Sequence, residues 1–305
     1  MTDFSVTILG ASAARPYPDA PASAAYVQCG GTRLLVDCGE GTLVALERAG
    51  RSHAKLDAVC ITHTHGDHVY GLPGLLTTMA LSGRRAPLDL IGPPPLRAFL
   101  DAALAHSHAH LTYELRHHPA GLATPRGAVL AYRDLEVSTL PLRHRVPAVG
   151  FRVSTTDKGL RLREGVVERL RIPYATIPAI RRGGDFEAPD GTVHPNSALT
   201  RSPAPARSMV YLSDTEPLWA YPSTWPPPTL LVHDATFAAA DAPLARKTGH
   251  STVVEAAAFA KTCGAERLLL THTSARYGDR DALLAEASAT FGTTEWAQPG
   301  ATYAL

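Results

Sequence analysis

The feature that most constrains this chain is a cluster of four side chains that can bind metal, spaced His63-x-His65-x-Asp67-His68. An apolar stretch, residues 58–61, runs directly into the cluster, which is therefore predicted at the end of a buried strand. Because side chains two apart in an extended segment point to the same side, His63 and His65 can reach one metal ion. After the turn that follows, Asp67 and His68 can face a second ion. Imidazole and carboxylate ligands together are typical of sites for zinc or a similar divalent cation.

The composition is that of a globular protein with a sizeable core: 305 residues, 45% hydrophobic and 19% charged. The N-terminus lacks the basic and apolar regions of a signal peptide, and no apolar run approaches the roughly 18 residues that a membrane span needs. The four cysteines are scattered, and three lie in apolar patterns typical of reduced core residues. We therefore expect a cytoplasmic protein without a membrane span.

Short apolar stretches alternate with helical patterns along most of the chain, which predicts a layered α/β fold. Several of these stretches end in a group that binds metal or transfers protons. In chain order, these groups are His144, Asp214, the pair His233-Asp234, and His272. Strands that present polar groups at their carboxyl ends are how α/β proteins build sites. Residues 268–273 also repeat the pattern of residues 60–64, since both stretches end in Thr-His-Thr, which indicates two related halves that face each other.

A segment from about residue 154 to residue 208 is irregular and rich in arginine and proline. Such length inside a compact domain is typical of a functional arm, a lid or disorder. Between Lys158 and Arg182 there are seven basic and two acidic residues, a local net charge of +5 against +1 for the whole chain. The segment is either the electrostatic footprint of a polyanion or a solvated arginine-rich arm. We expect one domain, residues 1–305, that carries this segment as an inserted arm.

Three further motifs accompany the histidine cluster. They are Asp-Cys-Gly-Glu-Gly-Thr at residues 37–42, Gly-His-Ser-Thr at residues 249–252, and Ser-x-Arg-Tyr at residues 274–277. With the histidine cluster, this combination resembles the metallo-β-lactamase fold hydrolases, and within them the ribonuclease Z branch of transfer-RNA 3′-processing endonucleases. The resemblance runs along nearly the whole chain. It implies an αββα sandwich with an inserted basic arm, a site for two zinc ions (Mn²⁺ or another divalent ion being an alternative), and a homodimer that acts on RNA, above all on precursor transfer RNA.

The same resemblance assigns the metal ligands by position. It implies His63, His65 and His144 for one ion, Asp67, His68 and His272 for the other, and Asp214 as a bridge between them. It also implies that Asp67 doubles as a general base for the attacking water and that Asp37 orients the loop that carries the ligands. Two such ions activate water near neutral pH and clamp both oxygens of a phosphoryl displacement.

The leaving 3′ oxygen of a cleaved RNA strand needs a proton, and the resemblance makes His250 the donor, held and polarised by Asp234. Thr252 and Glu255 form the pattern of a capping box, so His250 is expected just before a helix. Arg276 either binds a substrate phosphate or pairs with a carboxylate. On the arm, the candidates for substrate binding are Arg169, Arg171, Arg181 and Arg182.

Three departures from the family pattern concern the substrate. The family has a Pro-x-Lys-x-Arg-Asn loop that helps judge the RNA 3′ end, whereas residues 16–21 here contain neither base. The arm lacks the family's Gly-Pro-rich tip. Asp234 replaces a glutamate that is one methylene longer, so its pair with His250 must sit closer or bridge through water.

Two substrate classes therefore stay open. The charge of the arm favours RNA, and the missing bases favour a small or cyclic phosphodiester cleaved by the same site. A binding module without catalytic activity is disfavoured, because every expected ligand and His250 are present. A second histidine-rich stretch matches no family motif and is interpreted as surface: His106, His108 and His110, with His117 and His118.

Overall fold

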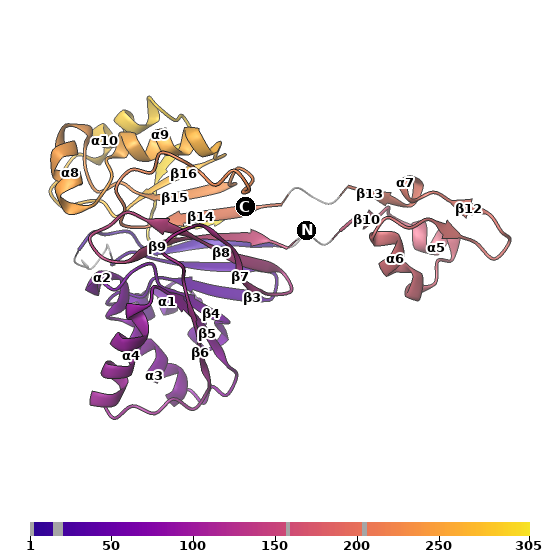
Figure 1. Cartoon of the computed structure of the whole chain (residues 1–305), viewed down its shortest axis with the longest axis horizontal. Coiled ribbons are helices and arrows are strands. Elements are labelled where there is room, and N and C mark those ends of the chain that lie inside the picture. The colour runs from indigo at the N-terminus through magenta and orange to yellow at the C-terminus, as the bar shows by residue number, and fades with distance from the viewer. Residues whose placement is uncertain (1–2, 15–20, 157–158, 203–205) are drawn as a thin grey trace. The chain divides into compact units, whose positions relative to one another are not determined.

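The computed structural model describes residues 3–14, 21–156, 159–202 and 206–305. It divides into two compact units (Figure 1): a main unit, formed by residues up to 155 and from 207 onward, and an arm unit, formed by residues 156–206. The arm unit covers the stretch that the sequence predicts as an insertion. Within the described ranges, no helix is both long enough and apolar enough to cross a membrane.

The N-terminal half of the main unit builds a sheet in the order β18-β1-β2-β3-β4-β5-β6. Its strands are β1 (Phe4–Gly10), β2 (Ala24–Cys29), β3 (Thr32–Val36), β4 (Ala58–Cys60), β5 (Leu88–Gly92), β6 (Leu115–Pro119) and β18 (Thr302–Ala304). From β3 to β6 the neighbouring strands are parallel, while β1 pairs antiparallel with β2 and β18. The parallel strands bring their carboxyl ends to one edge of the sheet.

The C-terminal half builds a second sheet in the order β17-β16-β15-β14-β9-β8-β7. Its strands are β7 (Arg126–Ala131), β8 (Leu135–Leu142), β9 (Ala148–Thr155), β14 (Ser208–Leu212), β15 (Leu230–Asp234), β16 (Leu268–Thr271) and β17 (Thr294–Trp296). The strands β14 to β17 run parallel, and β7, β8, β9 and β14 pair antiparallel. As in the first sheet, parallel strands lie beside an antiparallel half.

The two sheets pack face to face, and helices cover their outer faces (Figure 1). The central core contains residues of both sheets, such as Val27 and Cys60 from the first and Phe151 and Val232 from the second. The first sheet is covered by α1 (Thr42–Arg48), η1 (His53–Lys55), α2 (Gly66–Val69), α3 (Leu72–Leu81) and α4 (Pro95–His106), and the second by η3 (Ala239–Asp241), α8 (Ala242–Thr248), α9 (Val253–Cys263) and α10 (Arg280–Ser288).

Alternation along the strands sets these layers, because successive side chains point to opposite faces. On β4, Ala58 and Cys60 face the core between the sheets, whereas Val59 packs with α1, α3 and α4. On β15, Leu231 packs against α9 and Val232 faces the other sheet. The predicted αββα sandwich is confirmed.

The arm unit has its own small core, formed by Val166, Ile172, Ile180, Phe186 and Leu199. Two short antiparallel pairs frame it: β10 (Arg161–Leu162) with β13 (Thr200–Arg201), and β11 (Phe186–Glu187) with β12 (Val193–His194). Between them lie α5 (Val166–Leu170), η2 (Tyr174–Thr176), α6 (Ile177–Arg181) and α7 (Asn196–Leu199). The inserted segment is therefore a folded unit within its described residues.

Candidate metal centre

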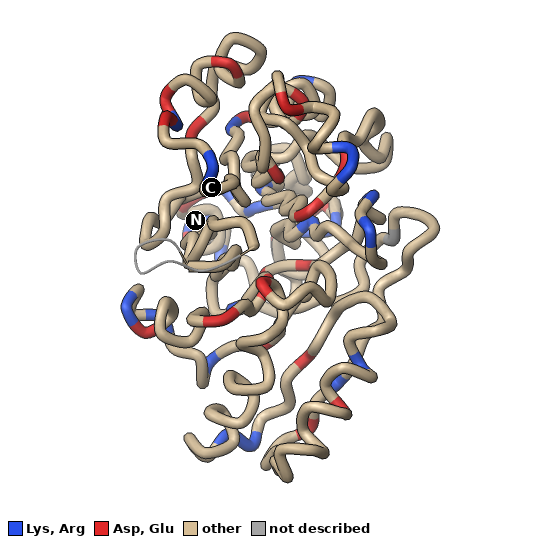
Figure 2. Tube along the Cα trace, turned by 90° about the vertical axis from the view of Figure 1, so that its left-hand side faces the viewer, with Lys and Arg blue, Asp and Glu red and all other residues tan. Residues whose placement is uncertain are grey.

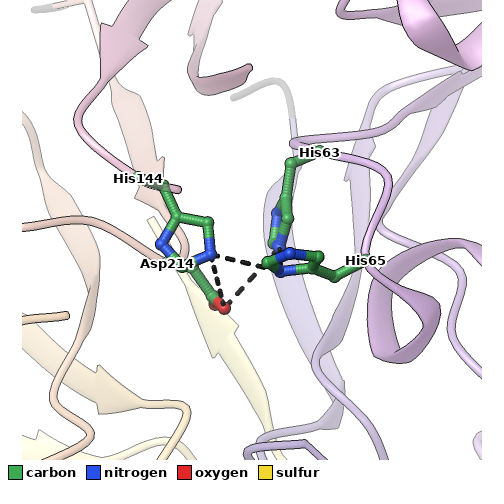
Figure 3. Close-up of side chains that lie close together, drawn as sticks. All are labelled: His63, His65, His144 and Asp214. Atoms are coloured by element: carbon green, nitrogen blue, oxygen red, sulfur yellow. Dashed lines mark hydrogen bonds and ion pairs between the residues drawn. The ribbon is translucent and has the colours of Figure 1, made fainter. Parts of the chain in front are cut away.

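The first cluster of metal-competent side chains joins the two sheets (Figure 3). His63 and His65 follow β4, His144 lies between β8 and β9, and Asp214 follows β14. Nδ1 of His65 lies 3.1 Å from Nε2 of His63 and 3.1 Å from Nε2 of His144. The Oδ2 atom of Asp214 lies 3.6 Å from Nε2 of His63 and 3.8 Å from Nε2 of His144. One ligand atom from each of the four lies within 4.8 Å of the others.

The second cluster consists of Asp67, His68, Asp214 and His272. Nε2 of His68 lies 3.4 Å from Oδ2 of Asp67, and Nε2 of His272 lies 3.3 Å from the same oxygen. The other oxygen of Asp214, Oδ1, lies 3.3 Å from Nε2 of His68 and 3.2 Å from Nε2 of His272. Asp214 thus turns one carboxylate oxygen toward each cluster.

Asp37 contacts the second cluster through the imidazole of His68. It follows β3, and its side chain is buried. Its Oδ2 atom lies 2.9 Å from Nδ1 of His68, and its Oδ1 atom accepts a hydrogen bond from the backbone N–H of Thr62 at 2.8 Å. Because Nδ1 of His68 faces Asp37, Nε2 is the nitrogen that faces the cluster. A carboxylate in this position fixes the ring and raises the basicity of a ligating imidazole.

The other imidazoles with a buried second nitrogen are oriented in a similar way. Nδ1 of His63 lies 3.1 Å from the hydroxyl of Thr62, and Nδ1 of His272 lies 3.0 Å from the hydroxyl of Thr236. Nδ1 of His144 lies 2.7 Å from the carbonyl oxygen of Gly249. Each ring therefore presents Nε2 to its cluster, which is the outer arrangement typical of ligating histidines.

Two of these residues adopt a left-handed backbone conformation that non-glycine residues seldom take. The φ angle is 59° at Asp37 and 58° at His272. Asp37 directly follows the last residue of β3, and His272 directly follows the last residue of β16. The chain thus turns sharply as it leaves β3 and β16, and both side chains are directed to the site.

The donor set fits two divalent cations. Burial lowers the pKa of His63 and of His144, which keeps both imidazoles in the neutral form that binds metal. Burial alone would raise the pKa of Asp214, but the surrounding histidines hold it well below its usual range. Nε2 of His68 is buried and has no hydrogen-bond partner among the described residues, although it faces two carboxylate oxygens. A cation between these atoms would satisfy all of them.

His250 and Asp234 lie beside the metal clusters. Asp234 ends β15, and Nδ1 of His250 lies 2.9 Å from its Oδ2 atom. The shorter side chain of Asp234 therefore reaches the imidazole directly, without a bridging water. Nε2 of His250 is directed toward the clusters, 4.0 Å from Oδ2 of Asp214. Burial disfavours the charged imidazole, but Asp234 and Asp214 outweigh it and raise the pKa of His250 to about 9.

The local sequence fixes the backbone on both sides of His250. Thr252 caps α9: its hydroxyl accepts a hydrogen bond from the backbone N–H of Glu255, and the Glu255 carboxylate accepts one from the backbone N–H of Thr252. This is the predicted capping box. Gly249, with φ 76°, ends α8. His250 is thus confined between two helix ends, and its side chain is buried.

Other predicted residues lie outside these clusters. Arg276 is exposed, and its guanidinium carbon lies 5.3 Å from the ring centroid of Phe237. His233 is buried with its ring 5.5 Å from that of Phe259, on the helix side of β15. Within the described residues, the histidine-rich stretch forms no group that could hold a metal ion, and His106 is exposed. His118 instead pairs with Asp89 at 2.7 Å.

The four arm arginines belong to the arm unit. Arg169, Arg171 and Arg182 are exposed, whereas Arg181 is half-buried and donates a hydrogen bond from Nε to the carbonyl oxygen of Leu160. Lys158 and residues 16–20 of the N-terminal loop lie outside the described residues.

Three residues that contact the site were assigned no role from the sequence. Thr236 binds His272, and its own hydroxyl donates to Asp234 at 2.6 Å. The carbonyl of Gly249 holds His144. Arg145 follows His144 and packs against Gly249. The only sequence signals for these positions were their places next to ligands and within the Gly-His-Ser-Thr motif.

Comparisons with known proteins agree with this geometry. The sequence profile of the anti-Pycsar protein Apyc1 matches residues 4–146. The chain is 35% identical over 303 residues to the ribonuclease Z of Parabacteroides distasonis, covering 98% of each chain. Human tRNase Z, short form, superposes with a TM-score of 0.71 at 27% identity over 98% of each chain. The metallo-β-lactamase fold protein YhfI of Bacillus subtilis superposes with a TM-score of 0.70 at 22% identity over the full length of both.

The two sheets with their helices have the metallo-β-lactamase fold. The histidine–aspartate clusters and the curated relatives define a metal-dependent hydrolase. The chain is 35% identical to a ribonuclease Z over nearly its entire length, which narrows the class of hydrolase to one family. The chain belongs to the ribonuclease Z family.

Proposed function

We propose that this chain is an endoribonuclease that removes the 3′ trailer of transfer-RNA precursors by hydrolysing one phosphodiester bond. The observation that carries this proposal is the position of Asp214, which turns one oxygen to each cluster beside the His250–Asp234 pair. Membership in the ribonuclease Z family supports the RNA substrate. The human structure with the same fold is named a tRNase Z, which supports a transfer-RNA precursor as the RNA substrate.

In this proposal two zinc ions occupy the clusters, with Mn²⁺ or another divalent ion as alternatives. The ligands would be His63, His65 and His144 for one ion, Asp67, His68 and His272 for the other, and Asp214 for both. When bound, two divalent ions activate a water molecule as the nucleophile and neutralise charge on the phosphoryl oxygens. The supporting observations are the burial of His63 and His144, which lowers the pKa of both imidazoles, and the fixed orientation of the ligand rings.

Asp67 would accept a proton from the attacking water. Its Oδ2 atom also accepts a hydrogen bond from the backbone N–H of Ala14 at 3.0 Å. The close imidazoles of His272 and His68 outweigh its burial and hold the pKa of Asp67 below its usual range, so the carboxylate is ionised before substrate binds. These contacts hold a carboxylate oxygen at the cluster, where it can accept a hydrogen bond from the attacking water.

His250 would protonate the leaving 3′ oxygen. With a pKa raised to about 9, its imidazole carries the required proton at neutral pH. Asp234 fixes the ring through Nδ1, and its own oxygens are held by Thr236, by the backbone N–H of Thr215 at 3.1 Å and by that of Ser251 at 3.3 Å. The proton is therefore held at Nε2, the atom directed toward the metal clusters.

The arm unit would bind the backbone of the RNA through Arg169, Arg171 and Arg182, with Arg181 as a weaker contributor because its Nε already serves Leu160. The proposal includes a homodimer in the cytoplasm, as the family resemblance implies. The exposed arginines and the local excess of positive charge support this role of the arm.

One assay tests the proposed function. Zinc-loaded protein is incubated with a 3′-extended transfer-RNA precursor and, separately, with bis(p-nitrophenyl) phosphate, and kcat/KM is compared. We expect a single cut at the 3′ trailer and a much higher kcat/KM for the precursor. Hydrolysis of the small ester without cleavage of the precursor would contradict the proposal.

A second candidate uses the same site on small or cyclic phosphodiesters. The stretch Pro16–Pro21 favours it, because it lacks the lysine and arginine with which the family judges an RNA 3′ end. The match of residues 4–146 to the anti-Pycsar protein Apyc1 covers the half of the chain that holds His63 to His68. The same assay, extended to a set of cyclic nucleotides, separates the two candidates.

A further inference from the structure

Arg145 is an exposed base placed beside both a metal ligand and the expected proton donor. It directly follows His144 in the chain. A Cβ atom built on Gly249 would lie 3.4 Å from Cγ of Arg145, so the stem of the arginine packs against the residue that precedes His250. The side chain thus starts at the point where the loop between β8 and β9 meets the end of α8.

Arg145 lies beside the expected metal centre, because its stem packs at Gly249, whose carbonyl oxygen lies 2.7 Å from Nδ1 of the ligand His144. A guanidinium beside a site for two divalent cations is repelled by them unless an anion lies between. Its position therefore favours a substrate with negative charge beyond that of one phosphodiester.

Arg145 has no ion-pair partner in the part of the chain that the structure describes, unlike many arginines of the main unit. Figure 2 shows basic and acidic positions interspersed along the trace. The ion pairs are Arg97 with Asp101, Arg116 with Glu114, Arg143 with Glu216, Arg246 with Glu255, and Arg267 with Glu295. Arg143 lies on the same loop, only two residues away, and is exposed as well. Among the described residues, Arg145 thus differs from Arg143, its neighbour on the loop, because no carboxylate engages its guanidinium.

A second exposed arginine approaches His250 through a different neighbour. The ring of Phe237 lies 6.0 Å from the ring of His250, and the guanidinium of Arg276 lies over Phe237. His250 thus has one unpaired arginine beside Gly249 and another beside Phe237, as far as the described residues extend. The two guanidinium groups could each pair with a phosphate. Such a pair of arginines suits an RNA strand, which carries phosphates on both sides of the leaving oxygen.

We propose that Arg145 binds the phosphate next to the scissile one, and thereby selects polynucleotides over diesters that carry a single phosphate. The inference rests on the proposed function, since it assigns the scissile phosphate to the metal centre. Arg145 makes no ion pair with Asp67 or Asp214, so its fork of N–H donors is available to a second phosphate. Because a single-phosphate diester has no such group, Arg145 raises the preference for RNA.

The test compares three variants with the wild type on precursor transfer RNA and on bis(p-nitrophenyl) phosphate. For Arg145→Ala, we expect the ratio of kcat/KM for RNA to kcat/KM for the small ester to fall about tenfold or more. The slope of log affinity for RNA against log salt should flatten by about 0.7, the value for one phosphate contact on a single strand. Arg145→Lys keeps the charge and should preserve the slope while losing part of the ratio.

Arg143→Ala is the matched control, because it removes an arginine of the same loop that is engaged by Glu216, and it should leave the ratio within about twofold. An unchanged ratio and salt slope in Arg145→Ala would overturn the inference, as would an equal loss on both substrates. The proposed function fails separately, if the wild-type protein hydrolyses the small ester and leaves RNA intact. Thermal unfolding of each variant checks that the fold is retained.

Discussion

The metal centre and the arm unit differ in how they hold the side chains proposed to act. At the metal centre, His63, His68 and Asp214 are buried; His63 and Asp214 follow parallel strands, and His68 lies in the short helix α2. Neighbouring polar groups fix the rings of His63 and His68. On the arm, Arg169 and Arg182 are exposed and sit on short helices around a small core. Chemistry therefore depends on positions that the whole sandwich determines, whereas the arm contributes charge at its surface. Changes in the first region should affect every substrate, and changes in the second should affect RNA alone.

The largest effect is expected at Asp214, because its two oxygens serve both clusters. Asp214→Ala should lower kcat/KM by at least about 10⁴-fold on precursor RNA and on bis(p-nitrophenyl) phosphate alike. The metal content by elemental analysis should fall below one ion per chain. Substantial hydrolysis of either substrate by a folded, metal-depleted variant would show that the centre is not the site of reaction.

The next largest effect is expected at His250, and it should depend on the leaving group. His250→Ala should slow RNA cleavage by roughly 10²–10⁴-fold while leaving RNA affinity nearly intact. Hydrolysis of bis(p-nitrophenyl) phosphate should change far less, because p-nitrophenolate leaves without a proton. His106→Ala, which removes an exposed histidine far from any cluster, is the control. Equal losses on the two substrates would rule out the donor role.

A smaller effect is expected at Asp37, which touches the ligand rather than the metal. Asp37→Asn replaces the charged acceptor at Nδ1 of His68, and metal affinity should fall about 10–100-fold. Competition with a chelator of known affinity measures this change. Asp101→Asn, which alters an exposed pair with Arg97, provides the comparison and should bind metal like the wild type. Identical affinities of the two variants would remove Asp37 from the account.

The smallest change in rate is expected for the arm, and it should appear only with RNA. Arg169, Arg171 and Arg182 are replaced together by glutamate, while Arg181 is kept because it hydrogen-bonds Leu160. RNA binding should weaken, and its salt dependence should flatten by about 0.7 for each lost contact. Hydrolysis of the small ester serves as the internal control. If precursor cleavage keeps its wild-type kcat/KM at low and high salt, the arm does not bind RNA.

Much of the fold and of the site could be predicted from the sequence, because strand ends carry distinctive residues. The alternation of apolar stretches and helical patterns predicted a layered α/β fold, and the family resemblance specified the αββα sandwich. The repeated Thr-His-Thr pattern follows one strand in each sheet, β4 and β16. The grouping of His144, Asp214 and His272 came from family resemblance. Local pattern alone leaves their partners undefined, since they meet only when the two sheets pack.

What escaped prediction depends on backbone geometry and on contacts that no motif encodes. The left-handed conformations of Asp37 and His272 arise from the turns after two strands. The direct contact of Asp234 with His250 depends on how the end of β15 sits against the end of α8. Arg145 occupies a position after His144 to which the sequence assigned no role, and only its contact with Gly249 places it next to the residue that precedes His250. Such features follow from tertiary packing rather than from residue spacing.

The most direct test of the central claim is a zinc titration of metal-free protein, followed by its cleavage of a 3′-extended transfer-RNA precursor. Seven converging ligands, with Asp214 shared between two clusters, predict that activity rises and saturates at two zinc ions per chain. The cut should fall at the junction of the trailer. Cleavage that is indifferent to zinc, or that is complete with one ion per chain, would contradict the two-metal account.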